Sequence, residues 1–421
     1  MSPMTRRELV GRFGVASAAG LEAGLTRRSD SAPKRVAAIV THYTHNSHAD
    51  IIVSRLLQGF NLDSQSPRPN LRLAGLYTDQ VPRDDISRRL AREYGFPIFP
   101  TIAETLALGG KELAVDGVLL IGEHGSYPLS DTSQIAYPRR RFFEETAAVF
   151  RKSGRSVPVF NDKHLSWNWE DAKWMYETAR ALKAPFMAGS SVPGTWRRPA
   201  REMRLDARAE EAVGLSFGPL EGYGYHGLEA MQSIVERRRG GETGVKAVQL
   251  LEGDAVWQAA ERGRFDPRVF EAAAQAREAK GRFQGALKSA LKPAALFIEY
   301  LDGFTAVLIH DMGAANSEWV TAWREAGARE CQAAVHYTQE ARPFGHFTFL
   351  LQGIEKMILT GKPTWPVERT LLVTGMLAAL FQSRKQRGAR IETPHLRIAY
   401  RPAAAWKQPP APPPDRPIDG Q

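Results

Sequence analysis

The sequence predicts two domains, an α/β domain followed by an α+β domain. In the first part of the chain, short runs rich in Val, Ile and Leu alternate with segments of helical period, the pattern of a doubly wound parallel sheet. Between residues 294 and 338 several strand-like runs follow one another without helices, which is typical of an antiparallel sheet. We therefore expect a Rossmann-like parallel sheet over residues 35–165, and a predominantly antiparallel open sheet flanked by helices over residues 166–400.

The first domain opens with a strand at Arg35–Val40, where apolar β-branched residues follow two basic ones. A turn at Thr41–Ser47 leads into a helix that covers Ala49–Leu57. Leu71–Tyr77 is expected to be the second strand, and the continuous apolar run in Val115–Gly122 predicts a strand buried on both faces. The remaining elements of this domain are expected as strands at 97–99 and 157–160 and helices at 84–94, 102–108 and 142–152.

The second domain is expected to begin with an amphipathic helix at Trp167–Ala184. A long strand at Glu202–Phe217 and a helix at Tyr223–Arg238 follow, and Asp302-Gly303 supplies the positive-φ positions of a hairpin turn. The other strands are expected at 185–189, 244–251, 294–302, 305–311, 319–324 and 333–338, and two closing helices at 343–361 and 366–386. Residues 401–421 are Pro-rich and predict a disordered tail.

The composition excludes several classes of protein. The net charge of +10 would suit a nucleic acid partner, but the Lys and Arg residues are dispersed along the chain, so none is expected. Cys331 is the only cysteine, which excludes an intrachain disulfide and a metal site built from cysteines. The apolar run Met376–Phe381 is too short to span a bilayer, so no integral membrane segment is expected.

Residues 1–34 have the composition of a targeting segment. Thr5-Arg6-Arg7-Glu8-Leu9 resembles a twin-arginine export signal, and Phe13–Leu21 supplies a short apolar region. This pattern predicts a periplasmic or secreted protein. The alternative is a disordered basic tail on a cytoplasmic protein.

The turn at Thr41–Ser47 has an unusual composition for its position. A strand, a tight turn and a helix near the start of such a sheet form the place where a dinucleotide pyrophosphate normally binds. A phosphate cradle needs glycine for close backbone approach and positive φ, yet this turn contains none. Nucleotide binding is therefore expected to be weak or displaced from the normal pose, yet present.

Five segments in sequence order carry a resemblance to a known family. They are RVAAIV…SHAD at 35–50, GLYTDQ at 75–80, AREYGFPIFPTIAETL at 91–106, VDGVLLIG at 115–122 and PVFNDKHLS at 158–166. Together they resemble the glucose–fructose oxidoreductase/inositol dehydrogenase (Gfo/Idh/MocA) family over roughly residues 35–400. The resemblance implies an oxidoreductase-like enzyme that acts on a sugar or cyclitol with NAD or NADP, here as a divergent member without the glycine-rich fingerprint.

The same resemblance implies where a nicotinamide nucleotide would bind. The fingerprint glycines are replaced by Val40, His42 and His45, whereas the histidine that follows them is kept as His48. The acidic position that holds a ribose hydroxyl falls on Asp79. The cofactor-binding residues expected in this way are Thr41, His42, His45, Asp79, Glu123, His124 and Lys163.

Catalytic residues are implied in two segments. In VFNDKHL the family lysine that reaches the nicotinamide and the substrate corresponds to Lys163, with Asp162 and His164 as its neighbours. GYGYHGLEA resembles the region of the acid/base histidine, which places His226 in the catalytic position and Glu229 in the acidic position after it. His226 would take the proton of a substrate hydroxyl while Lys163 polarises the oxygen.

Other assignments remain open at this point. The family aspartate four residues before the histidine is replaced by Gly222 beside Glu221, so Glu123, His124 and Glu221 are the next candidates for acid/base residues. No metal site is expected, because histidines spaced by three, at 42, 45 and 48, cannot all face one point from a single helix. The alternative functions are a nucleotide-free carbohydrate-binding protein, and a glycosidase or epimerase with tightly bound NAD. By analogy with the family, a homo-oligomer could form through the broad sheet.

Overall fold

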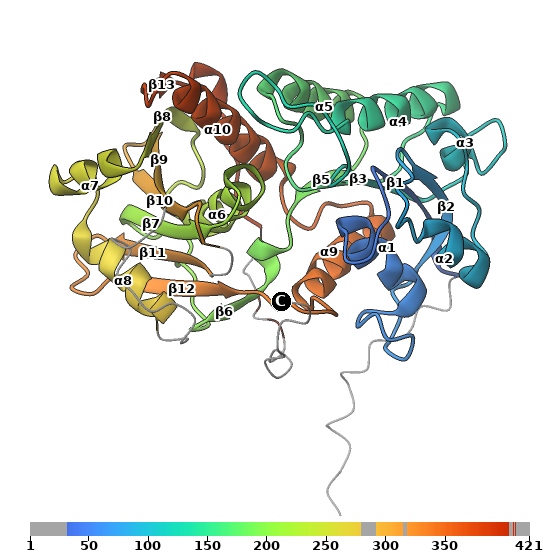
Figure 1. Cartoon of the computed structure of the whole chain (residues 1–421), viewed down its shortest axis with the longest axis horizontal. Helices are drawn as coiled ribbons and strands as arrows, with labels where there is room; N and C mark the ends of the chain where they lie inside the picture. Colours follow the sequence, from blue (N-terminus) through green and yellow to red (C-terminus); the bar gives the residue numbers. More distant parts are fainter. Residues whose placement is uncertain (1–31, 279–291, 315–317, 404–406, 408, 410–421) are drawn as a thin grey trace, which may run out of the picture. The chain divides into compact units, whose positions relative to one another are not determined.

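Two β-sheets organise the described part of the chain (Figure 1). The structure is a computed structural model and describes residues 32–278, 292–314, 318–403, 407 and 409. The expected signal at 1–34 lies almost entirely outside these residues, and so does most of the tail at 401–421. Within the described ranges, no helix combines the length and the apolar character that a membrane crossing needs.

The first sheet is parallel throughout its described pairs, as predicted, with the strand order β2-β1-β3-β4-β5. Its strands are β1 (Lys34–Val40), β2 (Leu71–Thr78), β3 (Gly117–Ile121), β4 (Val159–Asp162) and β5 (Phe186–Gly189). The strand expected at 97–99 is reduced to a single bridge between Ile98 and Leu76. Pro97 and Pro100 flank this position and cannot donate ladder hydrogen bonds, which limits the pairing.

Helices cover both faces of the first sheet, because alternate residues of β1 point to different cores. Val36 and Ala38 pack with α1 and α9, whereas Ala37 and Ile39 pack with α3, α4 and α5 (Figure 1). The helices concerned, together with α2 near the end of β2, are α1 (His48–Gln58), α2 (Ser87–Tyr94), α3 (Ile102–Ala107), α4 (Arg139–Ser153), α5 (Trp169–Ala181) and α9 (His346–Thr360). Strand β5 pairs in the first sheet, and α5 and α9 cover its faces, although all three follow residue 165. The expected domain limit at residue 165 therefore falls inside the sheet rather than after it.

The second sheet is predominantly antiparallel, as predicted, with the order β13-β8-β9-β10-β7-β11-β12-β6. Only β7 and β10 pair in parallel among its described pairs. Its strands are β6 (Trp196–Arg198), β7 (Ala209–Phe217), β8 (Val245–Glu252), β9 (Pro293–Tyr300), β10 (Thr305–Asp311), β11 (Trp319–Glu325), β12 (Gln332–Tyr337) and β13 (Ile391–Glu392). The long strand expected from Glu202 begins only at Ala209, because a turn at 205–206, in which the φ of Asp206 is 59°, comes before it.

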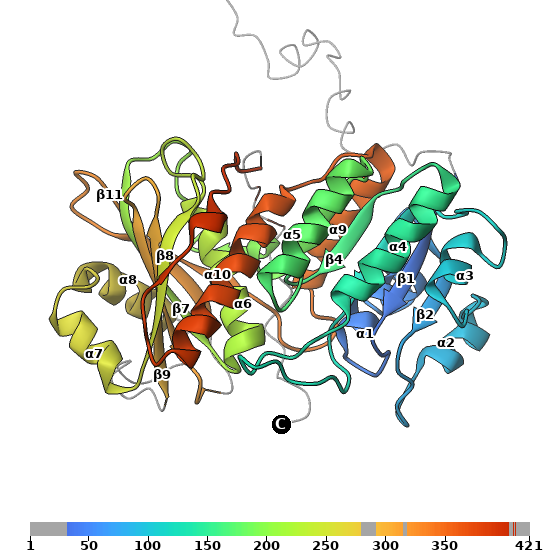
Figure 2. The same ribbon diagram turned by 90° about the horizontal axis from the view of Figure 1, so that it is seen from above.

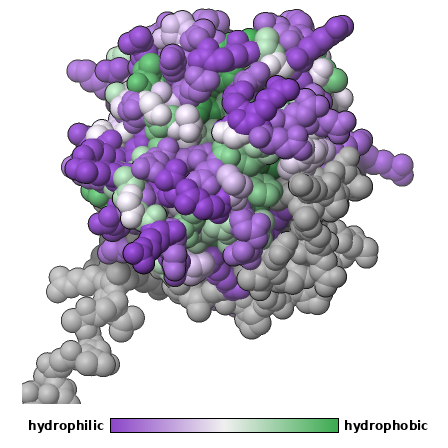
Figure 3. Space-filling view, turned by 90° about the vertical axis from the view of Figure 1, so that its left-hand side faces the viewer, coloured by the Kyte–Doolittle hydropathy of each residue, from purple (hydrophilic) through white to green (hydrophobic). Residues whose placement is uncertain are grey.

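Helices also cover both faces of the second sheet. One face packs against α6 (Leu220–Val235) and α10 (Val367–Lys385), and the other against α7 (Asp254–Glu261) and α8 (Pro267–Glu278). The sequence analysis predicts no element at 254–278. The side that carries α7 and α8 presents many hydrophilic residues with smaller hydrophobic patches (Figure 3). Helices α7 and α8 thus cover this face of the sheet.

The two sheets belong to one compact unit. Helix α10 packs against α5 as well as α6, so it joins the layers of the two sheets (Figure 2). The carboxyl ends of the parallel strands thereby come to lie opposite the N-terminal end of α6. This arrangement positions the site described next.

Candidate active site

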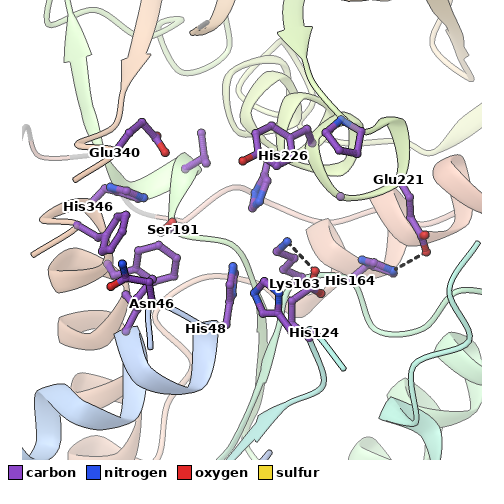
Figure 4. Close-up of a pocket in the computed structure, with 18 of the residues that line it drawn as sticks. Asn46, His48, His124, Lys163, His164, Ser191, Glu221, His226, Glu340 and His346 are labelled. Atoms are coloured by element: carbon purple, nitrogen blue, oxygen red, sulfur yellow. Dashed lines mark hydrogen bonds and ion pairs between the residues drawn. The ribbon is translucent and has the colours of Figure 1, made fainter. Parts of the chain in front are cut away.

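A cleft of about 350 Å³ lies at the carboxyl ends of the parallel strands, the edge where α/β folds bind ligands (Figure 4). Its opposite wall is formed by the N-terminal end of α6, the start of β11 and the segment before α9. The volume lies near the lower end of the range of about 300–1,000 Å³ for small-molecule pockets, which suits a compact ligand. The ionisable side chains that line the cleft include His48, Glu123, His124, Lys163, His164, Glu221, His226, Glu340 and His346.

Lys163 directly follows β4 and occupies a strained backbone position. Its φ is 58°, a left-handed value that non-glycine residues seldom adopt, and such strain concentrates at functional sites. Its Nζ donates to Glu123 Oε1 at 2.9 Å, and Arg139 donates to Glu123 Oε2 at 2.6 Å. Burial alone would raise the pKa of Glu123, but the charges of Lys163 and Arg139 hold it well below the ordinary value. Glu123 is therefore an ionised anchor that holds the lysine in the cleft.

His226 projects from α6 toward Lys163 across the cleft (Figure 4). Burial lowers its pKa well below the ordinary value, and the charges of Lys163 and His48 lower it further. Its ring lies 5.4 Å from that of Trp319, and its Nδ1 has no hydrogen-bond partner among the described residues. The imidazole is thus neutral near physiological pH and can accept a proton.

Glu221 stands on the first turn of α6 and faces the same cleft. Its Oε2 accepts a hydrogen bond from the backbone N–H of Ile135 at 2.9 Å, and its Oε1 lies 3.9 Å from His164 Nε2. Burial raises the pKa of this carboxyl from 4.5 to about 7. A carboxyl that titrates near neutral pH can both give and accept a proton, which makes Glu221 a stronger acid/base candidate than the sequence indicates.

His48 and Asp162 form a pair that the sequence analysis does not predict. His48 Nδ1 lies 2.7 Å from Asp162 Oδ2, and the aspartate at the end of β4 is fully buried. A proton shared with the carboxylate at Nδ1 leaves Nε2 as the acceptor, the arrangement of an oriented histidine base. His124, whose pKa burial lowers to about 3, lies beside it with 5.3 Å between ring centroids. No local signal could have joined residues that are 114 positions apart.

The predicted cofactor residues of the first turn, Thr41, His42 and His45, do not line the cleft. Thr41 is buried and donates its hydroxyl to the backbone oxygen of Glu123 at 2.6 Å. The ring of His42 stacks on that of His124 at 5.7 Å, one layer behind the cleft. His45 is exposed, and its Nδ1 lies 3.7 Å from Asp50. Within the described residues, no group of three or more His, Cys, Asp or Glu side chains is arranged to hold a metal ion.

Glu229, predicted to be catalytic, lies away from the cleft. It sits three residues after His226, about 4.5 Å farther along α6, and lines a separate cavity. Its carboxylate accepts the backbone N–H of Ser190 at 2.8 Å and the Thr370 hydroxyl at 3.1 Å. A Cβ on Gly189 would stand only 2.4 Å from Glu229 Oε1. This placement corrects the prediction: Glu229 joins α6, β5 and α10, and it does not face Lys163.

Comparison with known proteins identifies the fold. The sequence matches no protein-family model, and no curated protein matches it either. Scyllo-inositol dehydrogenase from Lactobacillus casei superposes with a TM-score of 0.52 at 11% identity, over 85% of this chain and 98% of that one. GenD2 from gentamicin A biosynthesis, in complex with NAD, gives 0.53 at 13% identity, over 88% and 99%. Myo-inositol 2-dehydrogenase from Lactobacillus plantarum gives 0.50 at 13% identity, over 86% and 99%.

The fold is that of the Gfo/Idh/MocA oxidoreductases. The two-domain architecture implied by the resemblance in sequence is therefore confirmed. In a fold of this type, a dinucleotide is expected to bind at the carboxyl ends of the parallel strands, with its phosphates and adenosine ribose near the ends of β1 and β2.

The residues at those strand ends do not fit a dinucleotide in the usual pose. The carboxylate of Asp50 lies at the N-terminus of α1, where a phosphate would bind, and accepts a hydrogen bond from Arg342 at 2.7 Å. Asp79, the expected ribose ligand, already accepts hydrogen bonds from Tyr77 and Tyr127 at 2.7 and 2.8 Å.

Proposed function

We propose that this chain is an oxidoreductase-like enzyme of the Gfo/Idh/MocA type, whose cleft binds a sugar or cyclitol and moves a proton at one of its hydroxyl groups. The observation that carries this proposal is the convergence of Lys163, His226 and Glu221 on one small cleft at the strand ends. The two inositol dehydrogenases named among the structural neighbours support the substrate class.

Each of these side chains has a distinct task. Lys163 carries a positive charge fixed by Glu123 and donates a hydrogen bond to the substrate oxygen, which stabilises negative charge that develops there. His226, neutral through burial, accepts the hydroxyl proton. Glu221, with a pKa of about 7, can accept or return a proton from the same wall of the cleft. His48, oriented by Asp162, offers a second base from the opposite wall.

The aromatic lining also suits a hydroxylated ring. Tyr223, Trp319 and Phe347 contribute apolar surface beside the charged groups. Ligand pockets typically combine such apolar and aromatic walls with a few placed polar groups that fix orientation. A sugar or cyclitol offers its C–H faces to the aromatic walls and its hydroxyls to the polar groups.

The test starts from binding and proceeds to turnover. Saturation-transfer NMR against a panel of monosaccharides and inositols should identify binders, and prolonged incubation should reveal a product. Lys163→Ala and His226→Ala should each lower the rate by about 10²–10⁴, with circular dichroism unchanged. Lys173→Ala, an exposed lysine of α5, is the matched control and should leave the rate unchanged.

Two results would overturn the proposal. If both cleft variants turn over like the wild type, the cleft is not the active site. If the wild type binds a sugar but converts none under any condition, the chain is the nucleotide-free carbohydrate-binding protein that the sequence analysis left open.

A dehydrogenase that uses NAD or NADP is the second candidate. The observation that favours it is the likeness of the fold to GenD2, whose structure holds NAD. It requires the nucleotide to bind outside the usual pose. Net reduction of added nucleotide in the presence of a cyclitol would support this candidate. A glycosidase or epimerase with bound NAD would instead release nucleotide into an acid extract and show no net reduction.

We also propose that the protein is exported through the twin-arginine pathway. The motif Thr5-Arg6-Arg7 supports this proposal. Replacing Arg6 and Arg7 by lysine should retain the protein in the cytoplasm of a bacterium with a working pathway. A wild-type protein that stays in the cytoplasm with an intact N-terminus would exclude it.

A further inference from the structure

We propose that the chain's own side chains occupy the phosphate and adenosine-ribose positions of the dinucleotide site, so that neither NAD nor NADP binds there in the usual pose. This inference goes beyond the proposed function, since the cleft residues around Lys163 are not involved. It rests on two groups of contacts, one at the N-terminus of α1 and one at the end of β2.

At the N-terminus of α1, a carboxylate stands in the place of a phosphate. Ser47 caps the helix and accepts the N–H of Asp50 at 3.3 Å. The Asp50 carboxylate, almost fully buried, accepts the backbone N–H of Asn46 at 2.9 Å and the Ser54 hydroxyl at 2.6 Å. Arg342, from the segment before α9, neutralises it at 2.7 Å. A second anion would find that Arg342 and the N–H of Asn46 already donate to the Asp50 carboxylate.

The backbone pairing of β1 with β2 also continues one residue beyond the two strand ends. Beyond the strand ends, Asp79 N donates to Val40 O at 2.9 Å and Gln80 N donates to Thr41 O at 2.8 Å. The next residue of the turn, after His42, is Tyr43, which is fully buried and shares a hydrogen bond with Ser54 at 2.7 Å. The turn is therefore anchored in the core by Tyr43, whereas a glycine-rich turn would leave its backbone open to a pyrophosphate.

At the end of β2, the loop that follows β3 lies where a ribose would bind. Gln80 and Ser126 exchange two hydrogen bonds of 2.8 and 2.9 Å, which fix the loop across the strand end. Tyr127 from this loop donates to Asp79 Oδ2 at 2.8 Å, while Tyr77 and Arg141 donate to Oδ1. The carboxylate that should receive two ribose hydroxyls thus already accepts three hydrogen bonds from the protein, out of the about four that a carboxylate can accept.

This arrangement predicts that Asp79 stabilises the folded protein. A residue that only binds a nucleotide would not affect stability in the absence of the nucleotide. Without any ligand, Asp79→Asn and Tyr127→Phe should each lower the melting temperature by about 2–4 °C, because a hydrogen bond to a charged group is lost. Glu112→Gln, an exposed carboxylate, is the matched control and should leave the melting temperature unchanged.

The direct test is calorimetric titration of purified wild-type protein with NAD, NADH, NADP, NADPH and ADP-ribose, after analysis of an acid extract. We expect no nucleotide in the extract and no binding at millimolar concentration. Stoichiometric nucleotide in the extract, or micromolar binding that Asp79→Asn weakens, would overturn the inference. Sugar binding by the cleft is measured separately, so that failure of this inference and failure of the proposed function remain distinguishable.

Discussion

Replacing Glu221 by glutamine should stabilise the protein at alkaline pH but much less at acidic pH. Burial raises the pKa of Glu221 from 4.5 to about 7, so between these values the folded state holds a proton that the unfolded chain has released. The wild-type free energy of unfolding therefore falls as the pH rises from about 4.5 to about 7, and this contribution is constant above that. At about 1.4 kcal/mol per pH unit, the full loss is about 3 kcal/mol.

Glutamine cannot ionise, yet its side-chain oxygen can still accept the backbone N–H of Ile135, so the variant escapes this loss. Urea unfolding should show an advantage over the wild type of below about 1 kcal/mol near pH 5 and about 3 kcal/mol near pH 8. Glu93→Gln, on the exposed side of α2, serves as the control and should change the free energy by less than about 0.5 kcal/mol throughout. An advantage that does not vary with pH would show that Glu221 ionises normally, and would refute its role as a carboxyl poised near neutrality.

Three further predictions concern other parts of the structure. Arg342→Ala leaves the buried Asp50 carboxylate without its cation and should lower the free energy of unfolding by about 1–3 kcal/mol in urea titrations; no loss would show that the pair is not formed. Gly353→Ala would place a Cβ 2.3 Å from the Trp365 ring and should cost about 1–3 kcal/mol, whereas Gly194→Ala, with open space around it, should be neutral; equal effects would contradict the packing. Nitrogen NMR should find the His48 proton on Nδ1, and Asp162→Asn should abolish this preference; an unchanged spectrum would exclude the pair.

The sequence alone determined the layers of this protein and part of its cleft. Continuous apolar runs in β1 and β3 indicate strands buried on both faces, which is typical of a parallel sheet. This prediction does not require knowing which helices cover the two faces. Since the ends of parallel strands meet at one edge, the positions of Glu123, His124 and Lys163 after β3 and β4 could be predicted to share a site. The absence of glycine from the first turn likewise predicted the misfit with a dinucleotide.

Only the tertiary structure decided which side chains meet. The apolar stripe of α9 indicates burial but not against what, and one of its partners turns out to be α1, some three hundred residues earlier in the chain. The same holds for the pairing of His48 with Asp162, for Tyr127 over Asp79, and for the raised pKa of Glu221. Periodicity reports how much of a residue is buried, whereas the pKa of a carboxyl and the orientation of an imidazole depend on the few atoms around it. Those atoms come from segments far apart in the chain, and they are fixed only when the two sheets close around the cleft.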